Sequence, residues 1–121
     1  MSQAEQHHKI DYIEFAATDV ALAKQFYATV FGWSFQDWGP DYIGFDAEGA
    51  GVNGGFRKIA PDETRGDAAP LIVLYSADLV ETQLAIEAAG GKIVVPPFEF
   101  PGGRRFHFSD GLGNVLAVWS E

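Results

Sequence analysis

The sequence predicts an α+β fold made of two βαβββ modules. Three observations indicate it: one order of elements occurs twice, short segments alternate between apolar and polar residues, and two longer segments repeat apolar residues at helical spacing. Asp19 and Asp78, which precede the longer segments, stand 59 positions apart, and Gly32 and Gly91, which follow them, also stand 59 positions apart. Equal offsets at both ends of a helix are typical of an internal duplication.

The whole chain, residues 1–121, is expected to form a single domain. Residues 9–58 make up the first predicted module, the polar segment 59–69 the linker, and residues 70–120 the second module. One helix covers only one face of a small sheet, so we expect the two modules to pair.

An aromatic and β-branched segment near the N-terminus predicts the first strand. Successive side chains of a strand point to opposite faces. Ile13, Phe15 and Ala17 therefore share the face that suits the core, and Tyr12 and Glu14 share the other.

Two helices are expected, over residues 20–31 and 79–89. Asp19 or Thr18 caps the first and Asp78 the second, because a side-chain oxygen at this position accepts from a free backbone N–H group. Glycines end both helices. The expected inner stripes consist of Leu22, Ala23, Phe26, Tyr27, Val30 and Phe31 in the first helix and Leu79, Ala85 and Ala89 in the second.

Turn-forming residues divide the rest of the chain into short strands. Glu48-Gly49-Ala50 is expected to be a turn, Pro96-Pro97 to end the strand that begins at Lys92, and Asp110–Asn114 to form a tight hairpin connection. The remaining strands are expected over residues 33–37, 41–46, 51–57, 92–95, 104–109 and 114–119.

Composition excludes several classes of protein. The net charge of −9 is unfavourable for binding nucleic acid or an anionic membrane. The chain has no cysteine, which excludes disulfides, thiolate nucleophiles and iron–sulfur clusters. No apolar run reaches the ~20 residues of a membrane helix. The polar start, residues 1–8, lacks the apolar core of a signal peptide, so we expect a cytoplasmic protein.

Four motifs spread over nearly the whole chain support a family resemblance. They are Glu14-Phe15-x-x-Thr18-Asp19, Phe26-Tyr27-x-x-Val30-Phe31-Gly32-Trp33, Ala88-Ala89-Gly90-Gly91-Lys92 and Asp110-Gly111-x-Gly113-Asn114. In these motifs and their order the chain resembles the vicinal oxygen chelate superfamily, which includes glyoxalase I, extradiol dioxygenases, and bleomycin and fosfomycin resistance proteins. The resemblance implies curved mixed sheets around a cleft, a homodimer, and in many members a divalent metal held by His, Glu or Gln.

The resemblance also implies positions for the metal ligands, and this sequence departs from them. The ligand expected about seven residues before each capping Asp corresponds to Tyr12 and Leu71, and the Glu expected on the last strand corresponds to Ala117. Leucine and alanine offer no lone pair, and a tyrosine hydroxyl is a poor neutral ligand. Near the fourth position, Asn53 and Arg57 do not suit the role either. We therefore expect no metal and no other cofactor.

Strand alternation suggests a different set of site residues. On the penultimate strand Phe106 and Phe108 suit the core, so Arg105 and His107 are expected to face the cleft. Together with Glu14 and aromatic walls they suit a small ligand with a polar or anionic end. The candidate ligand-binding residues are Tyr12, Glu14, Asn53, Arg105, His107 and Trp119.

The same residues also have structural interpretations. Glu14 and Arg105 are alternatively a pair that ties the modules together, and His107 is alternatively a hydrogen-bonded structural histidine. No catalytic residue is assigned, but Glu14 and His107 are candidate general bases if burial moves the pKa of either group toward neutrality.

Three functions remain open. The first is a metal-free protein that binds a small apolar or aromatic molecule, as drug-resistance members of the superfamily do. The second is a metal-dependent lyase or dioxygenase of the glyoxalase type, with ligands supplied by Glu14, His107 or a partner chain. The third is a metal-independent acid–base enzyme that uses Glu14 or His107. The unsuitable ligand positions favour the first, with a small-molecule ligand and a second copy of the chain as partners.

Overall fold

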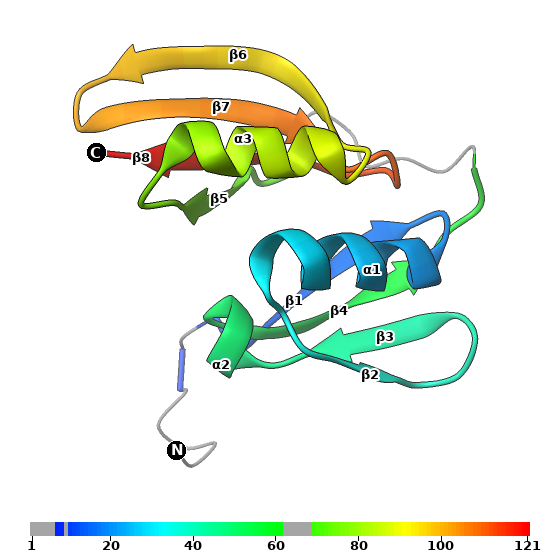
Figure 1. The fold of residues 1–121 in the computed structure, drawn as a ribbon. Helices are drawn as coiled ribbons and strands as arrows, with labels where there is room; N and C mark the ends of the chain where they lie inside the picture. The colour runs from blue at the N-terminus through cyan, green and yellow to red at the C-terminus, as the bar shows by residue number, and fades with distance from the viewer. Residues whose placement is uncertain (1–6, 9, 62–68) are drawn as a thin grey trace.

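The structure is a computed structural model that describes residues 7–8, 10–61 and 69–121. It contains two modules, one above the other in Figure 1, each with a helix lying across its sheet. The first module consists of β1 (Tyr12–Ala17), α1 (Val20–Phe31), β2 (Phe35–Asp37), β3 (Tyr42–Phe45), α2 (Ala47–Ala50) and β4 (Asn53–Lys58). The second consists of β5 (Ile72–Tyr75), α3 (Leu79–Ala88), β6 (Lys92–Phe100), β7 (Gly103–Ser109) and β8 (Val115–Ser120).

Each module has one four-stranded mixed sheet. Sheet 1 has the strand order β1-β4-β3-β2 and sheet 2 the order β5-β8-β7-β6. The first strand of each module runs parallel to the last, and the other neighbours are antiparallel. The predicted pair of βαβββ modules is therefore confirmed, with β1 and β5 as edge strands at equivalent positions.

The predicted residues stand at both ends of both helices. Asp19 accepts from the backbone N–H of Leu22 at 3.1 Å, and Asp78 caps α3 in the same way. Gly32 ends α1 with a φ of 75°. At the end of α3 the left-handed residue is Gly90, with a φ of 98°, so the offset of 59 holds only at the helix starts.

The helix-covered faces of both sheets share one hydrophobic core. Phe26 and Phe31 of α1 reach the second module, where their ring centroids lie 6.2 and 6.1 Å from that of Phe108. Two expectations about the helix stripes are corrected. Leu22 is 53% exposed, whereas its neighbour Ala23 is buried as expected, and α3 buries Ile86, which lies outside the expected stripe, in addition to Leu79.

A buried polar cluster joins the modules. Tyr27 of α1 donates to Asp110 Oδ2 at 2.9 Å, and Asn114 Nδ2 donates to the same oxygen at 2.9 Å and also to the carbonyl oxygen of Ala16 on β1. Asp110 Oδ1 accepts from the backbone N–H groups of Leu112 and Asn114 at 2.8 and 3.1 Å. The predicted hairpin connection thus also holds the two modules together.

Two predicted turns are corrected. β6 continues through Pro96-Pro97 to Phe100, with register shifts between Ile93 and Phe98. An edge strand tolerates proline, because the missing N–H group faces away from the sheet. Glu48-Gly49-Ala50 belongs to the short helix α2, which Asp46 caps through the N–H group of Gly49 at 3.2 Å.

Most of the predicted linker 59–69 lies outside the described residues. Within the described part, Ile59 still donates to the carbonyl oxygen of Ala17 at 3.0 Å and extends the pairing of β4 with β1. None of the described helices has both the length and the apolar character needed to cross a membrane.

Candidate functional site

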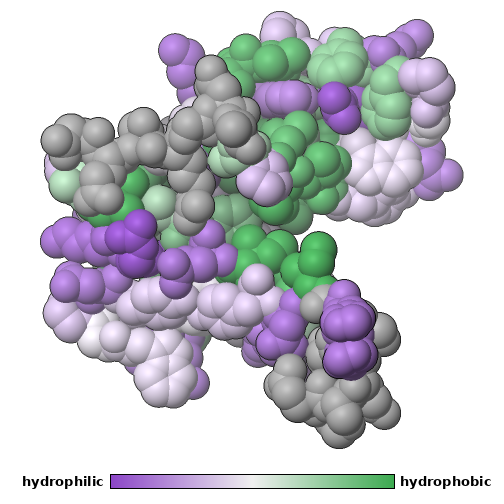
Figure 2. All heavy atoms as spheres, turned by 180° about the vertical axis from the view of Figure 1, so that it is seen from behind, coloured by the Kyte–Doolittle hydropathy of each residue, from purple (hydrophilic) through white to green (hydrophobic). Residues whose placement is uncertain are grey.

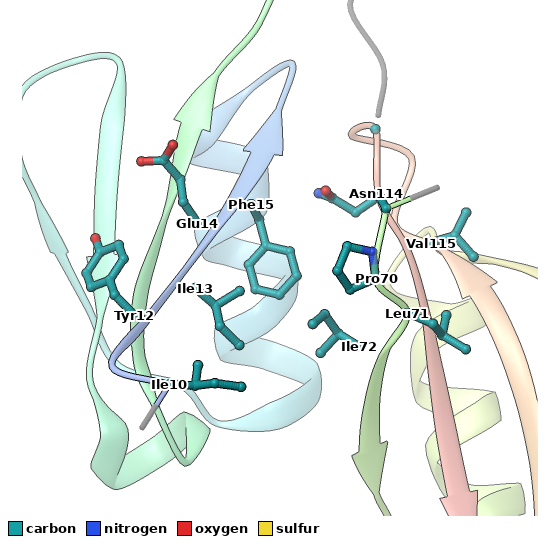
Figure 3. Close-up of a pocket in the computed structure, with 12 residues that line it drawn as sticks. Ile10, Tyr12, Ile13, Glu14, Phe15, Pro70, Leu71, Ile72, Asn114 and Val115 are labelled. Atoms are coloured by element: carbon teal, nitrogen blue, oxygen red, sulfur yellow. The ribbon is translucent and has the colours of Figure 1, made fainter. Parts of the chain in front are cut away.

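Each sheet has a face that is not covered by its helix, called here its open face. In Figure 3, Ile13 and Phe15 point from β1 toward Ile72, whereas Tyr12 and Glu14 leave β1 on the other side, away from the second module. Leu71 and Val115 point away from the first module in the same way. The two open faces of one chain therefore point in opposite directions.

This geometry corrects the expected cluster of Glu14, Arg105 and His107. Glu14 lies on the open face of sheet 1, whereas Arg105 and His107 lie on the open face of sheet 2. The alternative of a Glu14–Arg105 pair between the modules is also wrong, because Glu14 Oε2 lies 3.7 Å from Nε of Arg57. The predicted site residues fall into two groups: Tyr12, Glu14 and Asn53 on sheet 1, and Arg105, His107 and Trp119 on sheet 2.

On sheet 1, an aromatic side chain crosses a strand to reach Glu14. The Tyr42 hydroxyl lies 2.5 Å from that of Tyr12, and it also forms a hydrogen bond with Glu14. A Cβ atom on Gly55 would lie 2.5 Å from the Tyr42 hydroxyl oxygen. The missing side chain of Gly55 therefore lets Tyr42 of β3 extend across β4 to β1.

The environment of Tyr42 disfavours its ionised form. Partial burial raises the pKa of its hydroxyl above the ordinary value of 10.0, and the hydrogen bonds with Tyr12 and Glu14 raise it further. The group stays protonated over the physiological pH range and can act as a hydrogen-bond donor. Its partner Tyr12 belongs to the wall of a cavity of about 410 Å³, together with Trp38 and Asn53. Asn53 itself is engaged, since its Oδ1 accepts from the backbone N–H of Ala47 at 2.8 Å.

On sheet 2, Arg105 lies between aromatic rings. Its guanidinium carbon is 5.2 Å from the ring centroid of Phe98 and 5.5 Å from that of Phe100. Trp119, its register partner on β8, packs edge-on against Phe100 at 6.2 Å and against Tyr75 at 5.1 Å. A cavity of about 350 Å³ opens at this group, and Arg105, Phe100 and Trp119 belong to its wall.

Two buried side-chain nitrogen atoms on this face have no hydrogen-bond partner among the described residues. They are Nε of Arg105 and Nε2 of His107. Burial lowers the pKa of His107 below its ordinary value of 6.5, and the charge of Arg105 lowers it further. The imidazole is therefore neutral at pH 7. Burying a polar atom without a partner is unfavourable, which makes this group a candidate for binding a ligand.

A third cavity, of about 590 Å³, lies at the junction between the modules. It is bordered by β1 and by the segment that leads into β5, and Figure 3 shows Ile13, Phe15 and Ile72 pointing into it. The rear of the molecule carries hydrophobic surface in this hollow (Figure 2). Its walls are mainly apolar, so it is better suited to packing against apolar groups than to catalysis.

The residues at the expected metal positions do not fit a metal ion. Leu71 and Ala117 have no donor atom, and the Tyr12 hydroxyl is already paired with Tyr42. No group of three or more His, Asp or Glu side chains suited to a metal occurs within residues 7–8, 10–61 and 69–121.

Sequence reasoning missed four residues that shape the two sites. Phe98 and Phe100 follow Pro96-Pro97, where the sequence predicts that the strand ends. Only the pairing of β6 with β7 brings them to Arg105. Tyr42 and Arg57 reach Glu14 only because of the order of strands in sheet 1. The alternation Tyr42-x-Gly44 opposite Gly55-x-Arg57 was a signal, but it requires the strand register to interpret.

Comparison with solved structures shows the same fold in several proteins. A glyoxalase-related enzyme from Fulvimarina pelagi is 19% identical, with a TM-score of 0.76 over 94% of this chain and 88% of that one. The fosfomycin resistance protein FosX from Listeria monocytogenes is 16% identical, with a TM-score of 0.75 over 93% and 92%. Lactoylglutathione lyase from Agrobacterium tumefaciens is 20% identical, with a TM-score of 0.68 over 93% of each chain. At these identities the similarity shows the fold alone.

Comparison with proteins of curated function finds no match. The family model of the Glyoxalase/Bleomycin resistance protein/Dioxygenase superfamily, however, matches residues 9–118, which cover both modules. The chain therefore belongs to the glyoxalase/bleomycin resistance protein/dioxygenase superfamily.

Proposed function

We propose that this protein binds a small, flat apolar or aromatic molecule against the open face of sheet 2, without a metal ion. The observation that carries the proposal is the ring cluster of Tyr75, Phe98, Phe100 and Trp119 around Arg105. Aromatic walls with few polar groups are typical of small-molecule sites, and a volume of about 350 Å³ is sufficient for a compound of one or two rings.

The residues favour binding over metal-dependent chemistry. Among the structural relatives, one is described as a fosfomycin resistance protein and another as lactoylglutathione lyase, so the fold serves proteins with different tasks. The metal-dependent alternative needs donor atoms that Leu71 and Ala117 lack. A binding role of the drug-resistance type requires only the aromatic cavity.

The two edge strands support a homodimer. β1 and β5 each border the junction between the modules, where Ile10 and Val115 are 76% and 50% exposed. A second copy related by a twofold axis can cover both strands at once, because each copy offers the same pair of edges. The proposed dimer places sheet 1 of one copy beside sheet 2 of the other, so that their open faces form one cleft.

In such a dimer, the separated candidate residues regain a common site. Glu14 and Tyr42 of one protomer would face the Arg105 and His107 side of its partner. This arrangement keeps the predicted cleft but divides it between two chains, and it explains why neither open face is covered within one chain.

The proposal is tested by isothermal titration calorimetry with naphthalene-2-carboxamide, an uncharged two-ring probe. We expect saturable binding, and we expect Trp119→Leu to weaken it about tenfold, because a stacking contact is lost. Leu84→Ala, on the exposed side of α3 where Leu84 is 61% exposed, is the matched control and should bind like the wild type. Equal binding by Trp119→Leu contradicts the proposal, as does failure of the wild type to bind both this amide and naphthalene-2-carboxylate.

Glu14 supports a second candidate function, acid–base catalysis without a metal. Its carboxylate lies on the open face of sheet 1, where it contacts Arg57 and Tyr42, and this is a suitable position for a general base. The test is deuterium exchange into 2-indanone, a flat ketone with acidic α-hydrogens, followed by NMR. Catalysed exchange that Glu14→Gln slows by about a hundredfold or more supports this function, and exchange at the buffer rate contradicts it.

A further inference from the structure

We infer that the ligand of the sheet 2 cavity is an aromatic carboxylic acid, bound as its carboxylate by Arg105. The inference rests on the proposed function, because it names the class of molecule that the same cavity binds. It depends on the charge and the hydrogen-bond donors of Arg105. Binding of an uncharged aromatic probe would not show whether the cavity prefers a carboxylate.

The charge of Arg105 is not neutralised within the described residues. Its guanidinium group lies against the rings of Phe98 and Phe100, with the neutral His107 on the same face of the strand. Glu121, two residues after Trp119, accepts from the Tyr75 hydroxyl at 3.0 Å. Glu99 is the register partner of Arg104, which points to the opposite face of β7 from Arg105.

Within the described part of one chain, this environment leaves a buried donor of the Arg105 cation without an acceptor. Nε of Arg105 is buried without a hydrogen-bond acceptor, although a guanidinium group has five N–H donors in a fixed plane. Two aromatic rings stabilise the charge only in part. A carboxylate accepts two parallel hydrogen bonds from this plane, and it would satisfy the buried donor and the charge together.

The walls define the rest of the ligand. Phe100 and Trp119 belong to the wall of the cavity, and Val73 adds an aliphatic contact. A flat ring next to the carboxylate can therefore stack on aromatic side chains. His107 lies two residues from Arg105 on the same strand face, so its unpartnered Nε2 offers a second contact about 7 Å further along the strand.

The net charge of the protein helps to interpret a preference for an anionic ligand. With a net charge of −9, the chain as a whole repels anions. A preference for a carboxylate over its neutral amide must therefore come from a local cation, and not from long-range attraction.

The experiment compares naphthalene-2-carboxylate with naphthalene-2-carboxamide by calorimetry at pH 7.5. The two probes have the same shape and differ in charge. We expect the wild type to bind the carboxylate about tenfold or more tightly than the amide, as for a charge-assisted hydrogen bond. We expect Arg105→Met to remove this preference while amide binding persists.

Two variants make the result specific. Arg105→Lys keeps the charge but not the planar pair of donors, so it should retain a reduced preference for the carboxylate. Arg104→Met, on the adjacent and exposed residue of β7, should keep the full preference. Thermal unfolding of each variant establishes that it is folded, and Arg105→Lys supplies the comparison if Arg105→Met does not fold.

The outcomes separate this inference from the proposed function. Equal affinity of the wild type for both probes, or an unchanged preference in Arg105→Met, overturns the carboxylate inference and leaves aromatic binding intact. Failure of both probes to bind contradicts the proposed function and the inference with it.

Discussion

A single hydroxyl group, that of Tyr27, connects α1 to the turn between β7 and β8. It is fully buried and donates to Asp110 at 2.9 Å, and burial together with this carboxylate raises the pKa of Tyr27 well above its ordinary value. Removing the hydroxyl leaves Asp110 with one hydrogen bond fewer in a place that water does not reach. The bond therefore contributes to the association of the two modules.

We predict that Tyr27→Phe lowers the free energy of unfolding by about 1–2 kcal/mol. Urea denaturation followed by circular dichroism measures it. Tyr75→Phe is the control, because Tyr75 is 54% exposed and its bond to Glu121 lies at the surface, so its change should stay within about 0.5 kcal/mol. Similar losses in both variants would show that the Asp110 cluster does not contribute as described.

The pKa of His107 is a second prediction at the residue scale. Burial and the nearby Arg105 hold it below 6.5, so the unfolded chain binds a proton at this residue at higher pH than the folded chain does. The contribution of neutral His107 to the free energy of unfolding is fully present above pH 6.5, and it is lost as the pH falls through the pKa of the folded state. NMR titration should give a pKa below 6.5, and Arg105→Met should raise it. A value at or above 6.5 would contradict the burial of this imidazole.

At the scale of elements, the packing of β4 against β1 and β3 depends on glycine. A Cβ atom on Gly54 would overlap the carbonyl oxygen of Ile13 and the ring of Phe45. Gly49 in α2 has ordinary space, since its nearest neighbour would be the Trp33 Cα atom at 3.4 Å. The same substitution therefore has different consequences at the two positions.

We predict that Gly54→Ala lowers the free energy of unfolding by about 2 kcal/mol or more, because strand and ring must shift. Gly49→Ala should be neutral or slightly stabilising, since alanine is favoured over glycine in a helix. Thermal denaturation of both variants provides the comparison. A tolerated Gly54→Ala would mean that sheet 1 is not paired as described.

The sequence alone predicts those elements whose ends depend on nearby residues. Asp19 and Asp78 mark the helix starts, since a capping side chain bonds only to nearby backbone groups. The course of β6 could not be predicted in the same way, because Pro96-Pro97 is acceptable only in an edge strand, and edge position is a property of the whole sheet.

The candidate site could be predicted only by strand face. Alternation correctly assigned Arg105 and His107 to the face opposite Phe106 and Phe108. It could not assign the partner of Glu14, because the Arg57 contact depends on which strands are neighbours. Nor could it show that the two open faces point apart, which depends on how the modules pack.

At the scale of the whole molecule, the orientation of the open faces leads to the proposed homodimer. We predict that sedimentation velocity finds two chains per particle. Val115→Glu, at the junction between the modules, should shift the protein toward monomers, whereas Leu84→Glu on α3 should not. Both positions are well exposed in one chain, so neither variant should unfold it. A dimer that tolerates Val115→Glu would place the interface elsewhere.

We propose that this member of the superfamily binds a small molecule without a metal ion. Native mass spectrometry of protein purified without chelators detects both the ion and the ligand. We predict the mass of the polypeptide chains with no divalent ion retained, and an increase by the mass of naphthalene-2-carboxylate when that compound is added. One tightly held divalent ion per chain would contradict the account.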